Sequence, residues 1–239
     1  MRADFPQGYP LTVLDRPAIV VGGAAFDKRL LDRLMARGYP VIAADGAADA
    51  LLAQGVSPDF VVGDMDSIAD LSVFEKRSRV IAIEEQVTTD FEKCLYAVAA
   101  PAYFGLGLTG RRFDHTLTAL HVAVRVAHRA PLVIFDETDL MLAITGSVEL
   151  NLERRQRVSI FPLSPIRFER SEGLTYPLDG LTLAQGVRVG TSNEGGPGRV
   201  RIEPAEGEVA PYLVILPIED LGPVLALLDG APAPAHIEA

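Results

Sequence analysis

Asp64 and Asp66 stand two positions apart in the segment Gly63-Asp64-Met65-Asp66-Ser67. At this spacing two side chains share one face of an extended strand, and in a tight loop both carboxylates can reach a single cation. Magnesium takes oxygen ligands, usually one or two carboxylates completed by phosphate and water. The pair therefore predicts a site for magnesium and phosphate, whereas an isolated Asp-x-Asp would more often be two turn-forming aspartates.

A second cluster occupies residues 88–93, Thr-Thr-Asp-Phe-Glu-Lys. We expect Thr89 to cap a helix that begins at Asp90, because its hydroxyl can accept a hydrogen bond from the first turn. The amides of that turn and the positive end of the helix dipole then form a phosphate site. Lys93, one turn further, could reach a β- or γ-phosphate. Taken alone, Asp90 and Lys93 would be an ordinary surface pair.

The third cluster is Gly110-Arg111-Arg112-Phe113-Asp114-His115. A glycine loop here opens a helix that carries a carboxylate and an imidazole in its first turn, preceded by two guanidinium groups suited to phosphate. Arg112 and Asp114 are the pair that we single out. By itself the segment would more often be a solvated loop, and His115 a capping or packing residue.

The elements that must position these clusters alternate between strands and helices. We predict strands near 18–21, 41–44, 60–62, 80–83, 103–106 and 132–135, and helices near 27–37, 47–54, 90–99 and 114–128. Such alternation predicts a parallel sheet covered on both faces, with ligands beyond the carboxyl ends of its strands. The three clusters and Asp45-Gly46 all follow strands in this way. Because all of them are expected at one edge, a shared functional site explains them better than separate interpretations as turn, surface or loop residues.

The second half has a different pattern, because the helical signal disappears after about Asp136. Short alternating segments predict strands near 140–144, 148–152, 158–162, 181–183, 187–189, 200–202 and 212–216, separated by turn residues. We therefore predict an α/β plus all-β chain: a Rossmann-like parallel-sheet domain over 1–137, an antiparallel β-sandwich over 138–228 and a flexible tail over 229–239.

Composition narrows the possible functions. The 239 residues carry a formal net charge of −10, which argues against broad binding to nucleic acid or anionic membranes. No apolar run approaches the roughly 18 to 20 residues of a membrane span, so we expect a cytoplasmic protein. The single cysteine, Cys94, excludes an internal disulfide, and we expect a buried, inert thiol.

In their order and spacing, five segments together resemble the thiamine pyrophosphokinase family, over roughly Val20 to Ile215. They are 44–47 (Ala-Asp-Gly-Ala), 58–67 (Pro-Asp-Phe-Val-Val-Gly-Asp-Met-Asp-Ser), 89–93 (Thr-Asp-Phe-Glu-Lys), 110–115 and 191–194 (Thr-Ser-Asn-Glu). The resemblance implies an α/β domain that holds Mg-ATP and a β-sandwich that contributes to a thiamine pocket. It also implies a homodimer whose sites combine the first domain of one subunit with the second domain of the other.

The same resemblance implies residue roles. The carboxylates for magnesium or the ATP polyphosphate would be Asp64, Asp66, Asp90 and Asp114. Asp45 would lie nearby, and Lys93 and Arg112 would contact phosphates. The nucleotide site would also include Gly46, Ser67, Thr89 and His115, and Ser192 and Asn193 would lie near thiamine.

Two positions depart from the family pattern. Arg111 stands where members commonly have a second glycine, which reduces the backbone freedom of that loop. Tyr176 stands where many members have tryptophan, and the chain has no tryptophan at all. A tyrosine ring can still stack on a pyrimidine or thiazolium ring, with less face area.

The predicted reaction is in-line attack of the thiamine hydroxyl on the β-phosphorus of ATP, with AMP leaving and positioning as the main work of the protein. Two other enzyme classes fit less well. Val20-Val-Gly-Gly lacks the full dinucleotide fingerprint of an oxidoreductase. An Asp-x-Asp phosphohydrolase would leave Lys93, Arg112 and the second domain unexplained. A non-catalytic nucleotide- or thiamine-binding regulator remains the alternative.

Overall fold

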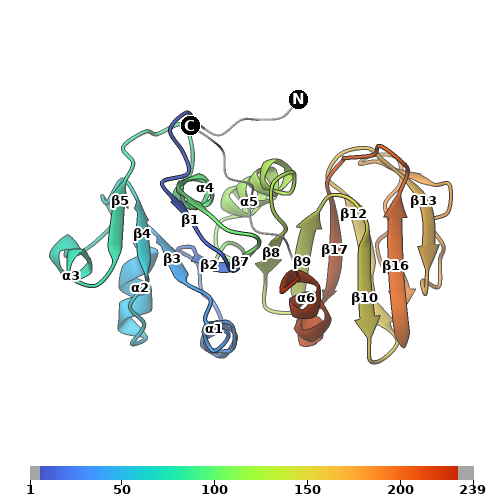
Figure 1. The fold of residues 1–239 in the computed structure, drawn as a ribbon, viewed down its shortest axis with the longest axis horizontal. Helices are drawn as coiled ribbons and strands as arrows, with labels where there is room; N and C mark the ends of the chain where they lie inside the picture. The colour runs from blue at the N-terminus through green and yellow to red at the C-terminus, as the bar shows by residue number, and fades with distance from the viewer. Residues whose placement is uncertain (1–5, 231–239) are drawn as a thin grey trace. The chain divides into compact units, whose positions relative to one another are not determined.

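The computed structural model describes residues 6–230, which form two compact units (Figure 1). The first unit extends to Val122 and the second begins at Ala123, inside helix α5 (Phe113–Val126). The sequence analysis predicted the boundary between the two domains later in the chain, near residues 136–139. Strand β8 (Leu132–Phe135) lies in the second unit because it pairs antiparallel with β9 (Asp139–Ile144). The predicted tail lies outside the described residues from 231 onward.

The first unit contains a parallel sheet of five strands in the order β7-β2-β3-β4-β5. The strands are β2 (Ala18–Val21), β3 (Val41–Ala44), β4 (Phe60–Gly63), β5 (Arg79–Ala82) and β7 (Tyr103–Leu106). All but β5 are buried along their whole length, as their continuous apolar runs predict.

Helices cover both faces of this sheet. They are α1 (Lys28–Met35), α2 (Ala47–Ala53), α3 (Leu71–Glu75) and α4 (Asp90–Ala97). The first three connect strands that advance in one direction along the sheet, and α4 returns in the other. Because such crossovers are right-handed, α4 packs on the face opposite α1 and α2, as Figure 1 shows.

Local capping explains where several helices begin. Asp27 caps α1 as predicted, accepting a 2.8 Å hydrogen bond from the amide of Arg29, and Gly38 takes a φ of 78° just after the helix. Helix α3 is a helix that the sequence analysis missed. Its cap, Asp70, accepts a 3.1 Å hydrogen bond from the amide of Ser72.

Helix α4 ends two residues before the predicted 99. Its continuation forms strand β6 (Val98–Ala99), which pairs in parallel with β1 (Thr12–Val13). The amides of Leu11 and Leu14 donate to the carbonyls of Ala97 and Ala99 at 2.9 and 2.8 Å. These carbonyls are used by a neighbouring segment, so tertiary pairing ends the helix here.

The second unit is built from antiparallel strands. One sheet has the order β12-β17-β9-β8, with β12 at Ser159–Pro162 and β17 at Tyr212–Pro217. The other contains β10 (Val148–Leu152), β16 (Gly198–Pro204), β13 (Ile166–Glu172) and β14 (Thr182–Leu183). A short pair joins β11 (Gln156–Arg157) to β15 (Glu194–Gly195).

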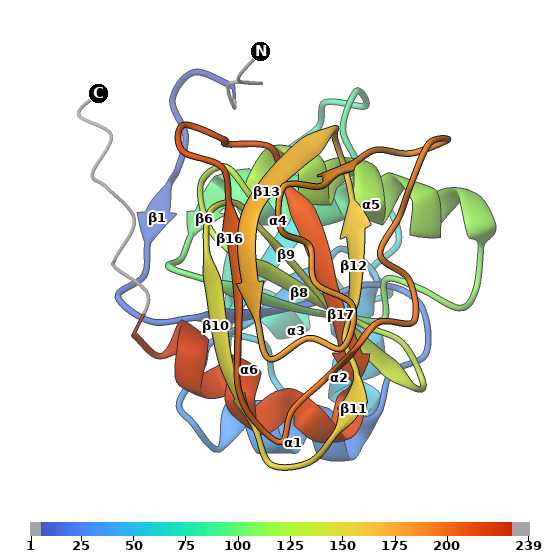
Figure 2. The same cartoon turned by 90° about the vertical axis from the view of Figure 1, so that its right-hand side faces the viewer.

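Figure 2 shows β10, β16 and β13 in front of β9 and β17. The buried rings of Phe168 on β13 and Tyr212 on β17 meet edge to face, with centroids 5.3 Å apart, and so join the two sheets. Burial alternates along β10, as the period-2 pattern predicts. The α/β plus all-β organisation is therefore confirmed.

Two predictions for this half are wrong. Helix α6 (Leu221–Leu228) follows the 3-10 turn η1 (Ile218–Asp220), although the helical signal was expected to end near Asp136. Its sequence, Leu-Gly-Pro-Val-Leu-Ala-Leu-Leu, is apolar on every side and hides the helical period. Residues 187–189 form no strand, because Gly186, with a φ of 74°, turns the chain so that the amide of Arg188 bonds to Ala184.

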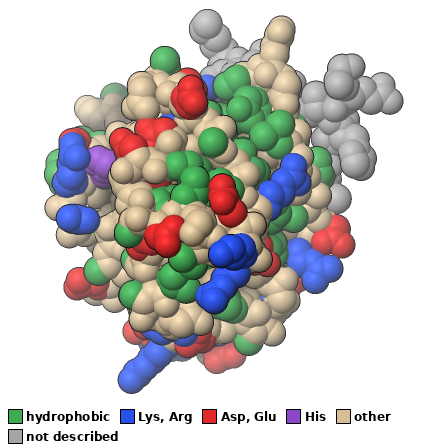
Figure 3. Space-filling view, turned by 90° about the vertical axis from the view of Figure 1, so that its left-hand side faces the viewer, with side chains coloured by type: hydrophobic (Ala, Val, Ile, Leu, Met, Phe, Trp, Pro, Cys, Tyr) green, Lys and Arg blue, Asp and Glu red, His purple; other side chains and the backbone are tan. Residues whose placement is uncertain are grey.

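Within residues 6–230, none of the helices combines the length and apolar character that crossing a bilayer requires. Figure 3 shows basic and acidic side chains interspersed with apolar ones on one face of the molecule. Charge of either sign is therefore not gathered into a broad patch on that face.

Candidate active site

A pocket of about 680 Å³ opens at the carboxyl edge of the parallel sheet in the first unit. Loops after all five strands line it, because parallel strands deliver their following loops to one edge. Nine of the residues predicted from sequence are among its lining: Asp45, Gly46, Asp64, Ser67, Thr89, Asp90, Lys93, Arg112 and His115. The convergence expected of the separate motifs is thus present.

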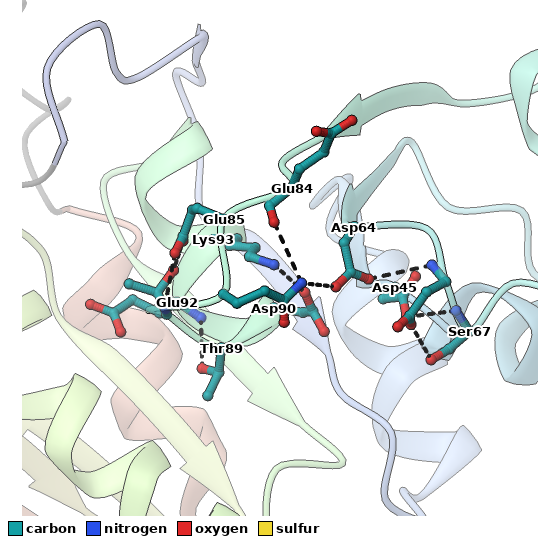
Figure 4. A network of polar contacts seen from close by, with 12 residues as sticks. Asp45, Asp64, Ser67, Glu84, Glu85, Thr89, Asp90, Glu92 and Lys93 are labelled. Atoms are coloured by element: carbon teal, nitrogen blue, oxygen red, sulfur yellow. Dashed lines mark hydrogen bonds and ion pairs between the residues drawn. The ribbon is translucent and has the colours of Figure 1, made fainter.

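Three carboxylates form the acidic centre of this edge, and we call Asp45, Asp64 and Asp66 the acidic triad. Each offers an oxygen, and these oxygens all lie within 4.8 Å of one another. Figure 4 shows the loop after β4 beside Asp45, with the Ser67 amide donating to Asp45 Oδ2 at 3.2 Å. This spacing suits a cation with oxygen ligands.

Asp45 is the least expected member, because the sequence placed it only near the carboxylate set. Its side chain is buried, with 4% of the residue exposed, and its Oδ1 has no hydrogen-bond partner among the described residues. Burial raises the pKa of the Asp45 carboxyl, and hydrogen bonding from Ser67 offsets only part of that. A buried carboxylate oxygen without a partner is costly, and a bound divalent cation would satisfy it, so the triad fits magnesium.

Asp64 is held differently. The Gln86 amide donates to its Oδ2 at 2.6 Å, and this hydrogen bond lowers the pKa of Asp64. The amide of Asp66 donates to Asp64 Oδ1 at 3.3 Å. Asp64 is therefore oriented as an ionised carboxylate, and Gln86 is a pocket residue that the sequence analysis missed because amide side chains carry no distinctive spacing.

Unusual backbone geometry brings the triad together. Asp45 and Met65 have φ angles of 46° and 67°, in the left-handed region that residues other than glycine seldom occupy. Gly63, at the end of β4, is packed so closely that a Cβ there would lie 2.7 Å from the Cβ of Asp45 and 3.2 Å from Asp90 Oδ1. A glycine at this position lets the carboxylates approach.

The start of α4 has the predicted geometry. Thr89 is its N-cap, and its hydroxyl accepts a 3.4 Å hydrogen bond from the Glu92 amide. Lys93 is only 1% exposed and its Nζ lies 3.1 Å from Asp90 Oδ1 (Figure 4). The surface-pair interpretation of Asp90 and Lys93 is therefore wrong, because the lysine carries its charge inside the pocket wall.

A second hydrogen-bond network, centred on the half-buried Glu85, supports the loop that leads to Thr89. Glu85 accepts hydrogen bonds from the amides of Val87 and Thr88 at 2.7 and 3.0 Å, and from the Tyr96 hydroxyl at 3.0 Å. Burial alone would raise the pKa of Glu85, but a hydrogen bond from the Thr88 hydroxyl, together with those from the two amides and Tyr96, outweighs it and lowers the pKa to about 2. Sequence reasoning missed Glu85, because a loop glutamate gives no sign of the amides that it accepts.

The third cluster is open to solvent. Arg112 Nη2 lies 2.6 Å from Asp114 Oδ2, and both side chains are 64% exposed. This hydrogen bond lowers the pKa of Asp114. Arg112 lines the pocket, whereas Asp114 is outside both the lining and the acidic triad. Arg111, one of the two departures from the family pattern, donates from Nη1 to the Gly23 carbonyl at 3.2 Å.

The residues predicted to meet thiamine lie in the second unit. Tyr176 is 64% exposed, Ser192 is exposed with a φ of 61°, and Asn193 is buried. Cys94 in the first unit is buried, and burial raises the pKa of its thiol, in keeping with an inert side chain.

Comparison with known proteins agrees with these motifs. Residues 31–135 match the family model for the thiamin pyrophosphokinase catalytic domain. Among solved structures, the thiamin pyrophosphokinase of Candida albicans is similar with a TM-score of 0.69 and 17% identity, over 85% of this chain and 89% of that one. The Bacillus subtilis enzyme is similar with a TM-score of 0.66 and 20% identity, over 84% of this chain and 98% of that one. The yeast enzyme is similar with a TM-score of 0.68 and 16% identity, over 87% of this chain and 88% of that one.

No curated protein is significantly similar in sequence. At these identities the solved structures establish the fold, and the family model covers the pocket lining except Gly22, Gly23 and Ala24. The predicted resemblance is confirmed: the chain has the thiamin pyrophosphokinase fold, and its residues 31–135 match the catalytic-domain model of the thiamin pyrophosphokinase family.

Proposed function

We propose that this protein transfers the pyrophosphoryl group of ATP to the hydroxyl of thiamine, giving thiamine diphosphate and AMP. The observation that carries the proposal is the pocket itself. A carboxylate oxygen of Asp45 that has no partner within residues 6–230 and a buried Lys93 charge lie at one strand edge, within the segment that matches the catalytic-domain family. Negative side chains beside a bound polyanion make chemical sense when a divalent cation lies between them.

Within this proposal the acidic triad holds magnesium, which when bound would neutralise charge on the phosphate oxygens. Asp90 lies beside the triad, with one oxygen engaged by Lys93. Asp114 was grouped with these carboxylates from sequence. We now propose that it acts on Arg112, to which it is paired, so Asp45 takes its place in the metal set.

The remaining residues bind and orient the nucleotide. In this proposal the parallel sheet is Rossmann-like, and the N-terminus of α4, capped by Thr89, directs the first-turn amides and the positive end of the helix dipole toward phosphate. Lys93 and Arg112 offset charge on the phosphoryl group during in-line transfer, and Gly46, Ser67 and His115 complete the wall. Catalysis in this scheme is positioning and charge neutralisation, without a covalent enzyme intermediate.

Thiamine would bind against the second unit, with the Tyr176 ring stacked on one of its two rings. We further propose a homodimer in which the second unit of one subunit completes the pocket of the other, acting in the cytoplasm. Size-exclusion chromatography coupled to light scattering tests the dimer. Mixing an inactive first-unit variant with a second-unit variant tests sharing, because only a shared site regains activity in the mixture.

The activity is tested by incubating the protein with ATP, thiamine and magnesium and measuring AMP and thiamine diphosphate by chromatography. Asp64→Asn removes charge but little volume, so it should abolish AMP formation and leave thermal unfolding unchanged. Asp32→Asn, at the exposed Lys28–Asp32 pair of α1, is the matched control. Thiamine or nucleotide binding without AMP would favour a non-catalytic regulator, and near-native turnover by Asp64→Asn would refute the role of the triad.

A further inference from the structure

The loop that carries Tyr176 is fastened to the segment 191–195 of the same unit. Although the Tyr176 side chain is 64% exposed, its main chain is held on both sides of the residue. The Tyr176 amide donates to Asn193 Oδ1 at 3.0 Å, and Asn193 Nδ2 donates to the Tyr176 carbonyl at 2.7 Å. One asparagine side chain thus replaces the strand partner that this backbone would otherwise need.

Asn193 has almost no hydrogen-bonding capacity left for a ligand. An amide oxygen accepts two hydrogen bonds, and Oδ1 takes both the Tyr176 amide and the Glu194 amide, the latter at 2.8 Å. Two backbone N–H groups directed at one atom also fix which end of the side chain is oxygen. Only 4% of Asn193 is exposed, so its remaining N–H has little access to a bound molecule.

Further contacts hold the same two segments together. Arg155 donates to Glu194 Oε2 at 2.9 and 2.6 Å and to the Thr175 hydroxyl at 3.1 Å. The Thr175 amide donates to the Glu194 carbonyl at 2.7 Å. The amide of Ser192, which lies in the left-handed region, donates to Ser159 Oγ at 3.0 Å, so the segment 191–195 is itself anchored to β12. The backbone on either side of Tyr176 is therefore fixed before any ligand arrives.

An exposed aromatic ring on a fixed backbone suits recognition of a flat ring, because little conformational entropy is lost when the ring is covered. Sequence reasoning assigned thiamine contact to Asn193 as well as to Tyr176. The geometry divides these roles: the tyrosine ring is available, and the asparagine side chain is already used.

We propose that Asn193 is a positioning residue of the thiamine subsite, which fixes the Tyr176 main chain and does not itself touch thiamine. This inference rests on the proposed function for the identity of the ligand. The pinning of the loop by Asn193 does not depend on it.

The absence of tryptophan from the chain offers a direct test. Tyr176→Trp introduces a single fluorophore at the ring position, and its anisotropy reports loop mobility without any ligand. Adding Asn193→Ala should lower this anisotropy, whereas Asn151→Ala, which changes the chain's other asparagine at an exposed position on β10, should not. Unchanged anisotropy in the Asn193→Ala protein would overturn the pinning role.

Kinetics separate positioning from contact. Asn193→Ala should raise the KM for thiamine about tenfold and leave kcat and the KM for ATP within about twofold, because only presentation of the ring is lost. In a Tyr176→Ala background the same change should add almost nothing, because the ring that it positions is gone. Fully additive effects on the thiamine KM would show a direct contact and reject the proposal.

Two further measurements keep the outcomes distinct. If Asn193→Ala does not fold, Arg155→Gln loosens the same loop from an exposed position and should give a smaller change in the same direction. Asn193→Asp keeps the acceptor atoms and should recover part of the anisotropy. A wild-type protein that forms no AMP refutes the proposed function, while the anisotropy result still decides the pinning role.

Discussion

The two sides of the pocket differ in how far they are built before a ligand binds. On the side of β3, β4 and α4, Asp45 and Lys93 are buried, and hydrogen bonds hold Asp64 in place. On the side of α5, Arg112 and Asp114 are exposed and form an ion pair with each other, and Asp114 Oδ1 also accepts a 2.9 Å hydrogen bond from the His115 amide. A solvent-exposed ion pair contributes little to stability because water screens it, so Arg112 can exchange its carboxylate for a phosphate at little cost.

This difference suggests a division of work. In the proposed function, the buried side holds a fixed arrangement of charge that matches a cation and the phosphoryl group, which is where pre-organisation lowers a barrier. In the same proposal, the exposed side supplies the Arg112 guanidinium, which exchanges Asp114 for a phosphate when the nucleotide binds. The buried side should therefore govern turnover, and the exposed side should govern affinity for the nucleotide.

The largest effect on turnover is expected from Lys93→Met on the buried side, a change that keeps the length of the side chain and removes its charge. We expect turnover to fall about 1,000-fold, because a buried charge directed at the phosphoryl group is lost. AMP formation under saturating ATP and thiamine measures it. Lys28→Met on α1 is the exposed control, and a similar loss in both proteins would argue against a special role for Lys93.

Asp45→Asn should lower turnover about 100-fold and also abolish stabilisation by magnesium. Magnesium binds only the folded triad in this scheme, so the wild-type melting temperature should rise with magnesium concentration. The variant should melt at a temperature that magnesium does not change. If magnesium raises the melting temperature of Asp45→Asn as much as that of the wild type, Asp45 is not a magnesium ligand.

Arg112→Lys tests the exposed side. It keeps the charge and loses the planar fork, so the KM for ATP should rise about tenfold while kcat changes little. The melting temperature should not move, because the pair with Asp114 is exposed. A fall in kcat as large as that of Lys93→Met would show that the exposed side also governs turnover, contrary to the proposed division.

The smallest effect is expected from Glu85→Gln and depends on pH. The pKa of Glu85 is lowered from 4.5 to about 2 in the folded protein, so its contribution to stability is present above pH 4.5 and is lost as pH falls toward 2. The variant should therefore melt below the wild type at pH 7, and the gap should close between pH 4.5 and about 2. A gap that stays constant with pH would mean that the charge of Glu85 is unimportant.

Sequence reasoning succeeded where local rules and tertiary structure agree. Thr89 followed by a helix predicted an N-cap, and carboxylates after successive strands predicted a shared edge. The sequence does not show which residues of a helix are buried, so it did not predict that Lys93 lies in the pocket wall. The orphaned Asp45 oxygen and the saturated Asn193 amide depend on contacts with segments distant in sequence, and no spacing rule contains them.

Gly63 shows how a missing atom can decide the charge density of a pocket. With hydrogen in place of a methyl group, β4 passes close enough to Asp45 and Asp90 for acidic groups from three loops to share one corner. A larger residue would have to push β3 and β4 apart, against a ladder of backbone hydrogen bonds. Homologues could therefore be sorted by this single position: any that carry a side chain here should have a wider, less acidic corner, whatever carboxylates they retain.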